Sequence, residues 1–133
     1  MSFTRLNPDS LHPTPGYHHV TIAPADRLAF LAGQCPLDVS GAVVGEGDLP
    51  AQVEQVVANA RTALAAAGSA PERVVRSVVY VVSDDSAVLA GVWRQLRESP
   101  LAPAFESAST LLGVAALGFP GQLVEIDLTA ALS

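Results

Sequence analysis

The chain has 133 residues, the length of one ordinary domain, and half of them are hydrophobic while only 15% are charged. This balance excludes intrinsic disorder, which needs few apolar and many charged residues. The longest uncharged apolar runs, such as 63–67, are far shorter than the ~18 residues of a membrane-spanning helix, and no basic segment leads into an apolar one at the start of the chain. We therefore expect a soluble, cytoplasmic protein that forms a single domain over residues 1–133 and does not enter a membrane.

Charge and residue usage exclude several classes of chemistry. Thirteen acidic residues outweigh seven basic ones, all of them arginine, which gives a net charge of −6. Without lysine the chain can form neither the Schiff base of pyridoxal phosphate enzymes nor a phosphate-binding loop of the lysine type. The absence of a basic cluster argues against nucleic acid as a partner. One cysteine and three histidines argue against an internal disulfide and a structural zinc site, so we expect neither a cofactor nor a metal.

The first half of the chain predicts a hairpin, a short strand and a helix. Residues 1–16 contain three prolines and predict an irregular lead-in. Residues 17–23 and 27–32 are rich in β-forming residues on either side of a Pro-Ala-Asp turn, which predicts a hairpin, and 42–44 predicts a short strand. From 48 to 67 the apolar residues recur with a helical period after a good N-cap, Asp48.

The second half predicts a helical turn at 69–72 and a strand at 74–82. A second helix is predicted from a cap at Asp84 or Asp85 to a stop at Pro100, followed by a hairpin of two long strands, 105–117 and 122–132. Together these elements predict an α+β fold with about six strands in one mixed sheet and two helices on one face. Residues 105–117 are apolar or small on both faces, so this strand must be buried on both sides. The helix-free face then needs cover from another copy of the chain, and we expect a homo-oligomer.

A few residues are candidates for chemistry. Glu125 and Asp127 share one face of the last predicted strand, where a carboxylate acts as a general base or positions a water; the alternative is an ordinary solvated face. His18 and His19 are neighbours on a predicted strand, so their rings diverge and make poor joint metal ligands, although one of them can face a cleft. Cys35 has no base or helix N-terminus close to it in sequence, which favours a small hydrophobic residue over a nucleophile.

Several segments carry a family resemblance. They are Gly-Tyr at 16–17, Leu-Ala-Gly-Gln-Cys-Pro-Leu-Asp at 31–38, Gly-Val-Ala-Ala-Leu at 113–117 and Leu-Val-Glu-Ile-Asp at 123–127. In this order and spacing they resemble the RidA (YjgF-type) family over almost the whole chain. The resemblance implies a chorismate-mutase-like fold, a homotrimer, and clefts between subunits that bind a small molecule. Some members of the family are imine or enamine deaminases, whose products are a keto acid and ammonia.

The resemblance also implies roles for single residues. Tyr17 and Glu125 match the tyrosine and the glutamate that help a bound water attack the C=N carbon, and we expect them to be catalytic. Gly33 matches a glycine of the cleft. His18 or His19 is expected beside Tyr17 in the substrate-binding part of the cleft.

Three cleft positions differ from the family pattern. Ser109 stands where the family has the arginine that pairs with the substrate's carboxylate, Leu111 where a cysteine is frequent, and Ala32 where a serine is common. A guanidinium gives a carboxylate two parallel charge-assisted hydrogen bonds, whereas a serine gives one neutral bond. We therefore expect an arginine-lacking branch of the family, with an imine or enamine substrate that has no free carboxylate. The alternatives are a non-catalytic small-ligand-binding or accessory protein and, against the charge of −6, an endoribonuclease like some relatives.

Overall fold

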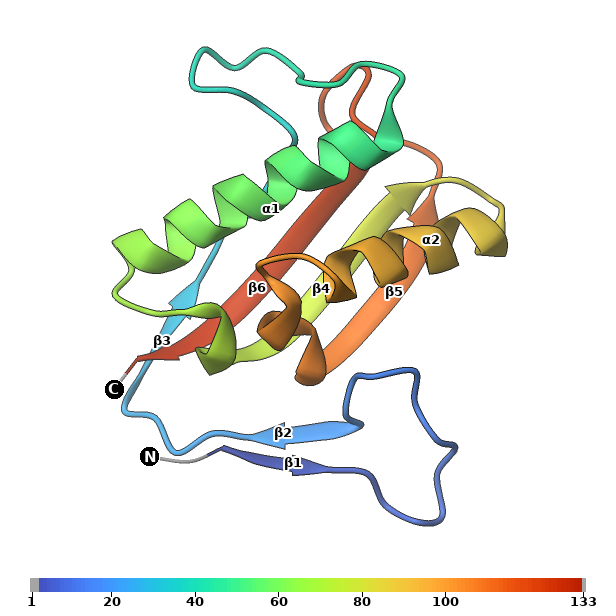
Figure 1. Ribbon diagram of the computed structural model, residues 1–133. Helices are drawn as coiled ribbons and strands as arrows, with labels where there is room; N and C mark the ends of the chain where they lie inside the picture. Colours follow the sequence, from blue (N-terminus) through green and yellow to red (C-terminus); the bar gives the residue numbers. More distant parts are fainter. Residues whose placement is uncertain (1–2, 133) are drawn as a thin grey trace.

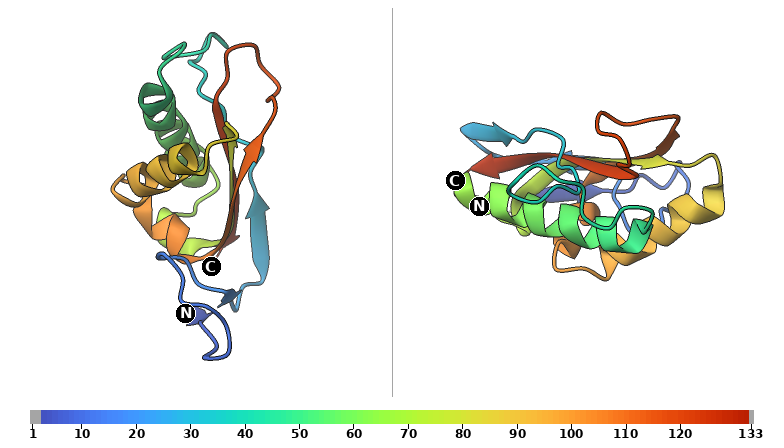
Figure 2. Two further views of the ribbon diagram at one scale, coloured as in Figure 1. Left: turned by 90° about the vertical axis from the view of Figure 1, so that its right-hand side faces the viewer. Right: turned by 90° about the horizontal axis from the view of Figure 1, so that it is seen from above.

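A four-stranded mixed sheet carries two α-helices on one of its faces (Figures 1 and 2). The computed structural model describes residues 3–132. The strand order is β3–β6–β4–β5, with bounds Arg27–Phe30, Val124–Leu132, Val74–Val82 and Ala108–Val114. The helices α1 and α2 span Leu49–Ala66 and Ser86–Arg97. A separate two-stranded sheet pairs β1, Thr4–Leu6, with β2, Val20–Ile22. Two short 3₁₀ helices, η1 and η2, span Pro71–Arg73 and Ala102–Glu106.

The predicted first helix is confirmed as α1. The side chain of Asp48 accepts the N–H of Ala51 at 3.1 Å, and Pro50 lies in the first turn, where its missing N–H costs nothing. Val56, Ala60 and other residues at the helical period are fully buried against the sheet. The apolar period of the sequence therefore marks the face of α1 that packs on the sheet.

The core lies between the helices and the two central strands. Side chains alternate along β4 and β6, so that Val79 and Ile126, which are paired in register, are both fully buried on the helix side. The neighbouring pair, Tyr80 and Glu125, faces the other way and is half-buried. The orientation of β6 thus places Glu125 on the face without helices.

The predicted hairpin of 105–117 with 122–132 is wrong. β5 lies at the edge of the sheet and runs parallel to β4, while β6 pairs antiparallel with the other side of β4. The physical reason is the connection between β4 and β5, which contains α2, since a helical crossover joins parallel neighbours. In addition, η2 occupies the beginning of the predicted strand, which starts only at Ala108.

The first predicted hairpin is also wrong. β2 pairs with β1, which lies inside the segment expected to be an irregular lead-in, and β3 pairs with β6. Residues 42–44 form no strand; Val43 makes only an isolated bridge with Leu37. β3 satisfies the backbone groups of β6 on the edge away from β4, which a local hairpin with β2 would leave unpaired. The six strands therefore lie in two sheets, not in the single sheet expected.

The face of the main sheet opposite the helices carries exposed apolar residues beside Glu125 and Asp127, and Figure 2 shows it without a covering layer. Phe30 and Leu28 of β3 are 77% and 45% exposed there. Tyr80 and Leu112, which are paired in register, lie half-buried on the same face. An apolar surface of this kind is what a contact with another subunit would cover.

No helix within residues 3–132 combines the length and the apolarity needed to cross a bilayer.

Candidate functional site

A cavity of about 330 Å³ lies between α2, β5 and the loop that ends at Tyr17, and it is called here the Tyr17 cavity. It brings together three residues that the sequence analysis singled out, Tyr17, Ser109 and Leu111. Its full lining is Pro15, Tyr17, Ser86, Leu89, Ala90, Trp93, Ser109 and Leu111. None of these eight side chains carries a charge at neutral pH.

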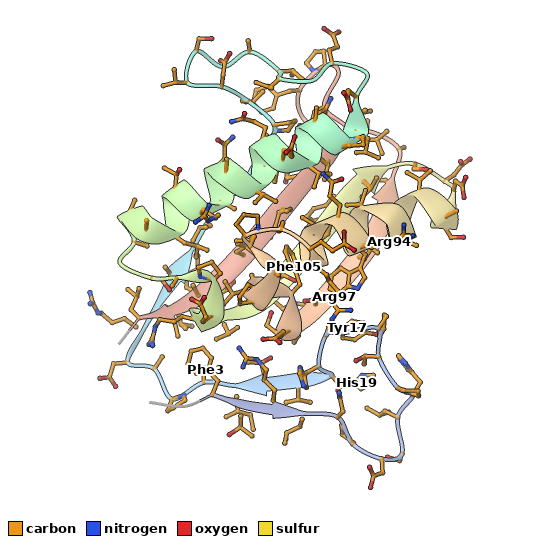
Figure 3. All side chains as sticks on the ribbon, in the orientation of Figure 1. Phe3, Tyr17, His19, Arg94, Arg97 and Phe105 are labelled. Atoms are coloured by element: carbon orange, nitrogen blue, oxygen red, sulfur yellow. The ribbon has the colours of Figure 1, made fainter. Side chains whose placement is uncertain are left out.

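The loop that carries Tyr17 is fastened to α2 (Figure 3). Trp93 Nε1 and a guanidinium N–H of Arg97 both donate to the carbonyl oxygen of Pro15, each at 3.0 Å. Gly16 has φ +117°, and a Cβ at this position would lie 2.2 Å from Arg97 Cζ. Only glycine therefore permits both this backbone conformation and the close approach of Arg97. The consequence is a fixed position for Tyr17 at the mouth of the cavity.

Aromatic rings build one wall of the Tyr17 cavity. The ring of Tyr17 meets that of Trp93 edge to face, with centroids 6.1 Å apart, and Trp93 meets Phe105 in the same manner at 5.6 Å. Trp93 is only 8% exposed and Phe105 1%. Such an edge-to-face series is a favourable and rigid arrangement of aromatic rings.

The hydroxyl of Ser109 is already engaged within the chain. It donates to the carbonyl oxygen of Ser107 at 3.0 Å and accepts from the hydroxyl of Ser77 at 2.5 Å. Ser77 is fully buried on β4, directly opposite Ser109 in the parallel register. The hydroxyl of Ser109 is therefore already hydrogen-bonded to two groups of the chain.

The two neighbouring histidines do not line the Tyr17 cavity. A ring nitrogen of His18 bonds to the carbonyl oxygen of Glu106 at 2.6 Å, and one of His19 to that of His12 at 2.8 Å. The ring of His19 also meets Tyr17 edge to face at 6.0 Å. Their contacts anchor the segment before β2, and His19 supports Tyr17 from outside the cavity.

A second group of predicted residues meets on the other face of the sheet. Gly33 lies against Glu125 so closely that a Cβ on Gly33 would be 2.1 Å from Glu125 Oε2. The backbone of Gln34 exchanges hydrogen bonds with Ile126 at 2.7 and 3.1 Å, which fixes this approach. Ala32 is exposed beside Gly33, and its carbonyl oxygen accepts from the Gln34 side chain at 3.0 Å.

Two donors hold the other oxygen of Glu125. The thiol of Cys35 donates to Glu125 Oε1 at 3.3 Å, and Gln122 Nε2 donates to the same oxygen at 3.2 Å. Burial, which is the largest cause, together with the hydrogen bond and the negative charge of Glu125 raises the pKa of Cys35 from its ordinary 9.0 to about 11. Cys35 therefore stays protonated at neutral pH, so it is a hydrogen-bond donor here and not a thiolate nucleophile.

Gln122 is a partner of Glu125 that the sequence did not point to. It is only 3% exposed, and Nε2 also donates to the carbonyl oxygen of Val124 at 3.1 Å. In the sequence it stands at the end of a Gly-Phe-Pro-Gly turn, where a glutamine is unremarkable. The signal that could have found it is its place three positions before Glu125, where a glutamine side chain can reach the carboxylate.

The two groups do not meet within one chain. Leu111 and Ser109 point to the helix side of β5, whereas Glu125 points to the opposite face of β6, with β4 between the two strands. Asp127 shares the face of Glu125 and is half-buried. No cluster of three or more His, Cys, Asp or Glu side chains suited to a metal ion occurs in the described part of the chain.

Comparison with known proteins identifies the relatives of this chain. The model of the family described as Endoribonuclease L-PSP matches residues 8–132. The crystal structure of YyfB from Yersinia pestis, a Rid family protein described as of unknown function, is 35% identical, covers 99% of this chain and 100% of its own, and superposes with a TM-score of 0.87.

Two curated proteins are also similar. RutC family protein slr0709 of Synechocystis is 34% identical over 123 residues, 90% of each chain. Protein DfrA of Myxococcus xanthus is 35% identical over 65 residues, about half of each chain. The helices, the mixed sheet and these matches agree, and the chain belongs to the Endoribonuclease L-PSP family, which is the RidA (YjgF-type) family that its sequence resembles.

Proposed function

We propose that the chain forms a homotrimer and hydrolyses a small imine or enamine without a free carboxylate, in clefts between subunits. The observation that carries this proposal is the separation of the Tyr17 cavity and Glu125 on opposite faces of one chain. A second copy whose β5 edge lies over the bare face of the first would bring its Tyr17 cavity to the Glu125 of the first. The exposed apolar residues on that face, Phe30 at 77% and Leu28 at 45%, support such a contact.

In the proposed reaction a water adds to the C=N carbon of the substrate. Glu125 Oε2 takes a proton from the water as the water oxygen bonds to carbon, and the carboxyl passes this proton to the imine nitrogen, which gives an aminoalcohol. The same carboxylate then moves the hydroxyl proton of the aminoalcohol to its nitrogen, the C–N bond breaks as the C=O bond forms, and the imine and one water have given a carbonyl compound and ammonia. An enamine first takes a proton on carbon to become the imine. The hydroxyl of Tyr17 orients the water in this scheme.

The hydrogen bonds of Glu125 support its role as the base. Cys35 and Gln122 both donate to Oε1, and no donor to Oε2 is present among residues 3–132. Gly33 has no side chain to cover Oε2. One carboxylate oxygen is thus held in place while the other is left to accept a proton.

The name of the family model mentions an endoribonuclease, but the charge of this chain does not favour RNA. A net charge of −6 on each copy repels a phosphate backbone, and the seven arginines form no cluster in the sequence. The imine or enamine reaction is therefore the function we propose.

Ammonia release tests the proposal. An amine oxidase acting on benzylamine supplies an imine without a carboxylate, and an amino acid oxidase acting on alanine supplies 2-iminopropionate. We expect this protein to accelerate ammonia release from the first and not from the second. Glu125→Gln should lower the acceleration by about a hundredfold or more, whereas Glu54→Gln, an exposed exchange on α1, should leave it unchanged.

Three outcomes would overturn the proposal. Acceleration of ammonia release from 2-iminopropionate alone would show that the substrate carries a carboxylate. Full activity of Glu125→Gln would show that Glu125 is not the base. Binding of amines or imines, seen as a rise in the unfolding temperature, without any acceleration would make the chain a non-catalytic small-ligand-binding protein.

A further inference from the structure

We propose that the Tyr17 cavity binds an uncharged aromatic group, and that this group, in place of a carboxylate, selects the substrate. The inference rests on the proposed function for its catalytic meaning, because the site is the same. Its binding part stands on the cavity alone and is tested separately below.

The size of the cavity fits a ring. A closed apolar cavity of about 150 Å³ is large enough to bind benzene, and the Tyr17 cavity, which is open on one side, has a volume of about 330 Å³. Leu89, Trp93 and Leu111 form apolar walls. Trp93 and Tyr17, which meet edge to face, both line the cavity, where a further ring can pack against them.

The polar groups near the cavity do not fit an anion. Ser109 is neutral, and its hydroxyl is already hydrogen-bonded to Ser107 and Ser77. Arg97 donates to the carbonyl oxygen of Pro15 and lies against Gly16, and it does not line the cavity. A carboxylate that entered would lose its hydration without gaining a charged partner, which is unfavourable. A neutral group has no such cost.

The test compares two molecules of the same shape. Phenylacetamide is neutral and phenylacetate is an anion, so they differ in charge and not in the ring. Trp93 is the one tryptophan of the sequence and it lines the cavity, so its fluorescence reports binding at this place. We expect phenylacetamide to change the fluorescence and to bind at least about tenfold more tightly than phenylacetate.

Substitutions on the exposed surface of α2 locate the binding. Ala90 is exposed and lines the cavity, so Ala90→Leu fills the cavity without touching the core, and we expect at least about tenfold weaker binding of phenylacetamide. Ala87→Leu is the matched control, because Ala87 is exposed on the same helix but does not line the cavity. It should bind as the unchanged protein does.

A gained positive charge should invert the preference. Ser109→Arg places a guanidinium in the cavity and should make phenylacetate bind more tightly than phenylacetamide. Since Ser109 contacts the buried Ser77, this variant can fail to fold; Ala90→Arg adds the same charge from an exposed helix position and keeps the test decisive. If neither folded variant shows the inversion, the charge argument is wrong.

The remaining outcomes separate the inference from the proposed function. Equal or tighter binding of phenylacetate by the unchanged protein would overturn the inference and indicate a cation from a partner subunit. Binding that Ala90→Leu does not weaken would place the ligand elsewhere and overturn it too. Binding of the ring without imine hydrolysis would support the inference and overturn the proposed function. Hydrolysis of the imines of ethylamine and benzylamine at the same kcat/KM would support the proposed function and overturn the inference, because the ring would then not select the substrate.

Discussion

The thiol of Cys35 and the carboxylate of Glu125 lie 3.3 Å apart, although 90 residues separate them in the chain. The segment that continues from β3 and the strand β6 bring them together, through the backbone bonds of Gln34 with Ile126. The contact couples the ionisation of the two groups, because the negative charge of Glu125 opposes formation of a thiolate. This coupling makes Cys35 a probe for the state of the proposed base.

Removal of the carboxylate charge should lower the pKa of Cys35. In Glu125→Gln we expect this pKa to fall from about 11 towards its ordinary value of 9.0, but not to reach it, because burial is the largest cause of the shift and remains. The rate of alkylation by iodoacetamide against pH measures it, and no assignment is needed since the sequence has one cysteine. Glu54→Gln serves as the control. Identical pH profiles for the two variants would show that Glu125 does not contact the thiol.

The same thiol should make the fold less stable at high pH. The unfolded thiol ionises near its ordinary pKa of 9.0, while the folded one ionises only near 11. The stabilising contribution of the neutral thiol is therefore complete below about pH 9 and is lost as the pH rises towards 11. Urea unfolding midpoints across this window should fall less in Cys35→Ser, whose hydroxyl does not ionise there. A fall of the same size in both proteins would assign the effect to other groups.

A methyl group on Gly33 should displace the proposed base. A Cβ there would lie 2.1 Å from Oε2, 2.6 Å from Cδ and 3.1 Å from Cγ of Glu125, so the side chain turns away and loses its hydrogen bonds with Cys35 and Gln122. Gly33→Ala should therefore cost about 1–2 kcal/mol of stability and lower imine hydrolysis by about tenfold or more. Thermal unfolding and ammonia release measure the two effects.

Gly91→Ala is the matched glycine control for that experiment. Gly91 lies in α2 with nothing within 4 Å of the position of a Cβ, so alanine should raise stability by roughly 0.5–1 kcal/mol and leave hydrolysis unchanged. Retention of full activity in Gly33→Ala would show that Glu125 Oε2 does not act at this position.

Local patterns in the sequence predicted the helices and the individual long strands. The cap at Asp48 and the apolar period after it define α1, and the β-branched run 74–82 has the bounds of β4. Strand pairing was not predictable in this way, because a period of two shows which face of a strand is buried and not which strand lies beside it. Both hairpin predictions failed for this reason, and β1 was missed because its three residues are surrounded by prolines and polar residues.

The candidate site divides along the same line. The resemblance to the family singled out Tyr17, Ser109 and Leu111, which line one cavity, and Gly33 and Glu125, which are in contact. The hydrogen bonds of these residues could not be predicted from the sequence. Ser109 is engaged by a serine that the parallel register of β4 and β5 places opposite it, and the parallel pairing was itself not predicted.

Assembly over the bare sheet face should depend on Phe30. Its side chain is 77% exposed, so a polar substitution costs the isolated fold little, whereas a charge buried in a subunit contact is strongly unfavourable. We expect Phe30→Glu to give the mass of one chain in size-exclusion chromatography with light scattering, where the unchanged protein gives the mass of three. Ala65→Glu, an exposed exchange on the outer side of α1, should leave the mass unchanged.

Because the proposed cleft needs Tyr17 and Glu125 from different copies, the Phe30→Glu monomer should also lose imine hydrolysis while it keeps its helical circular dichroism. A folded monomer that still hydrolyses the imine would show that one chain contains the whole site.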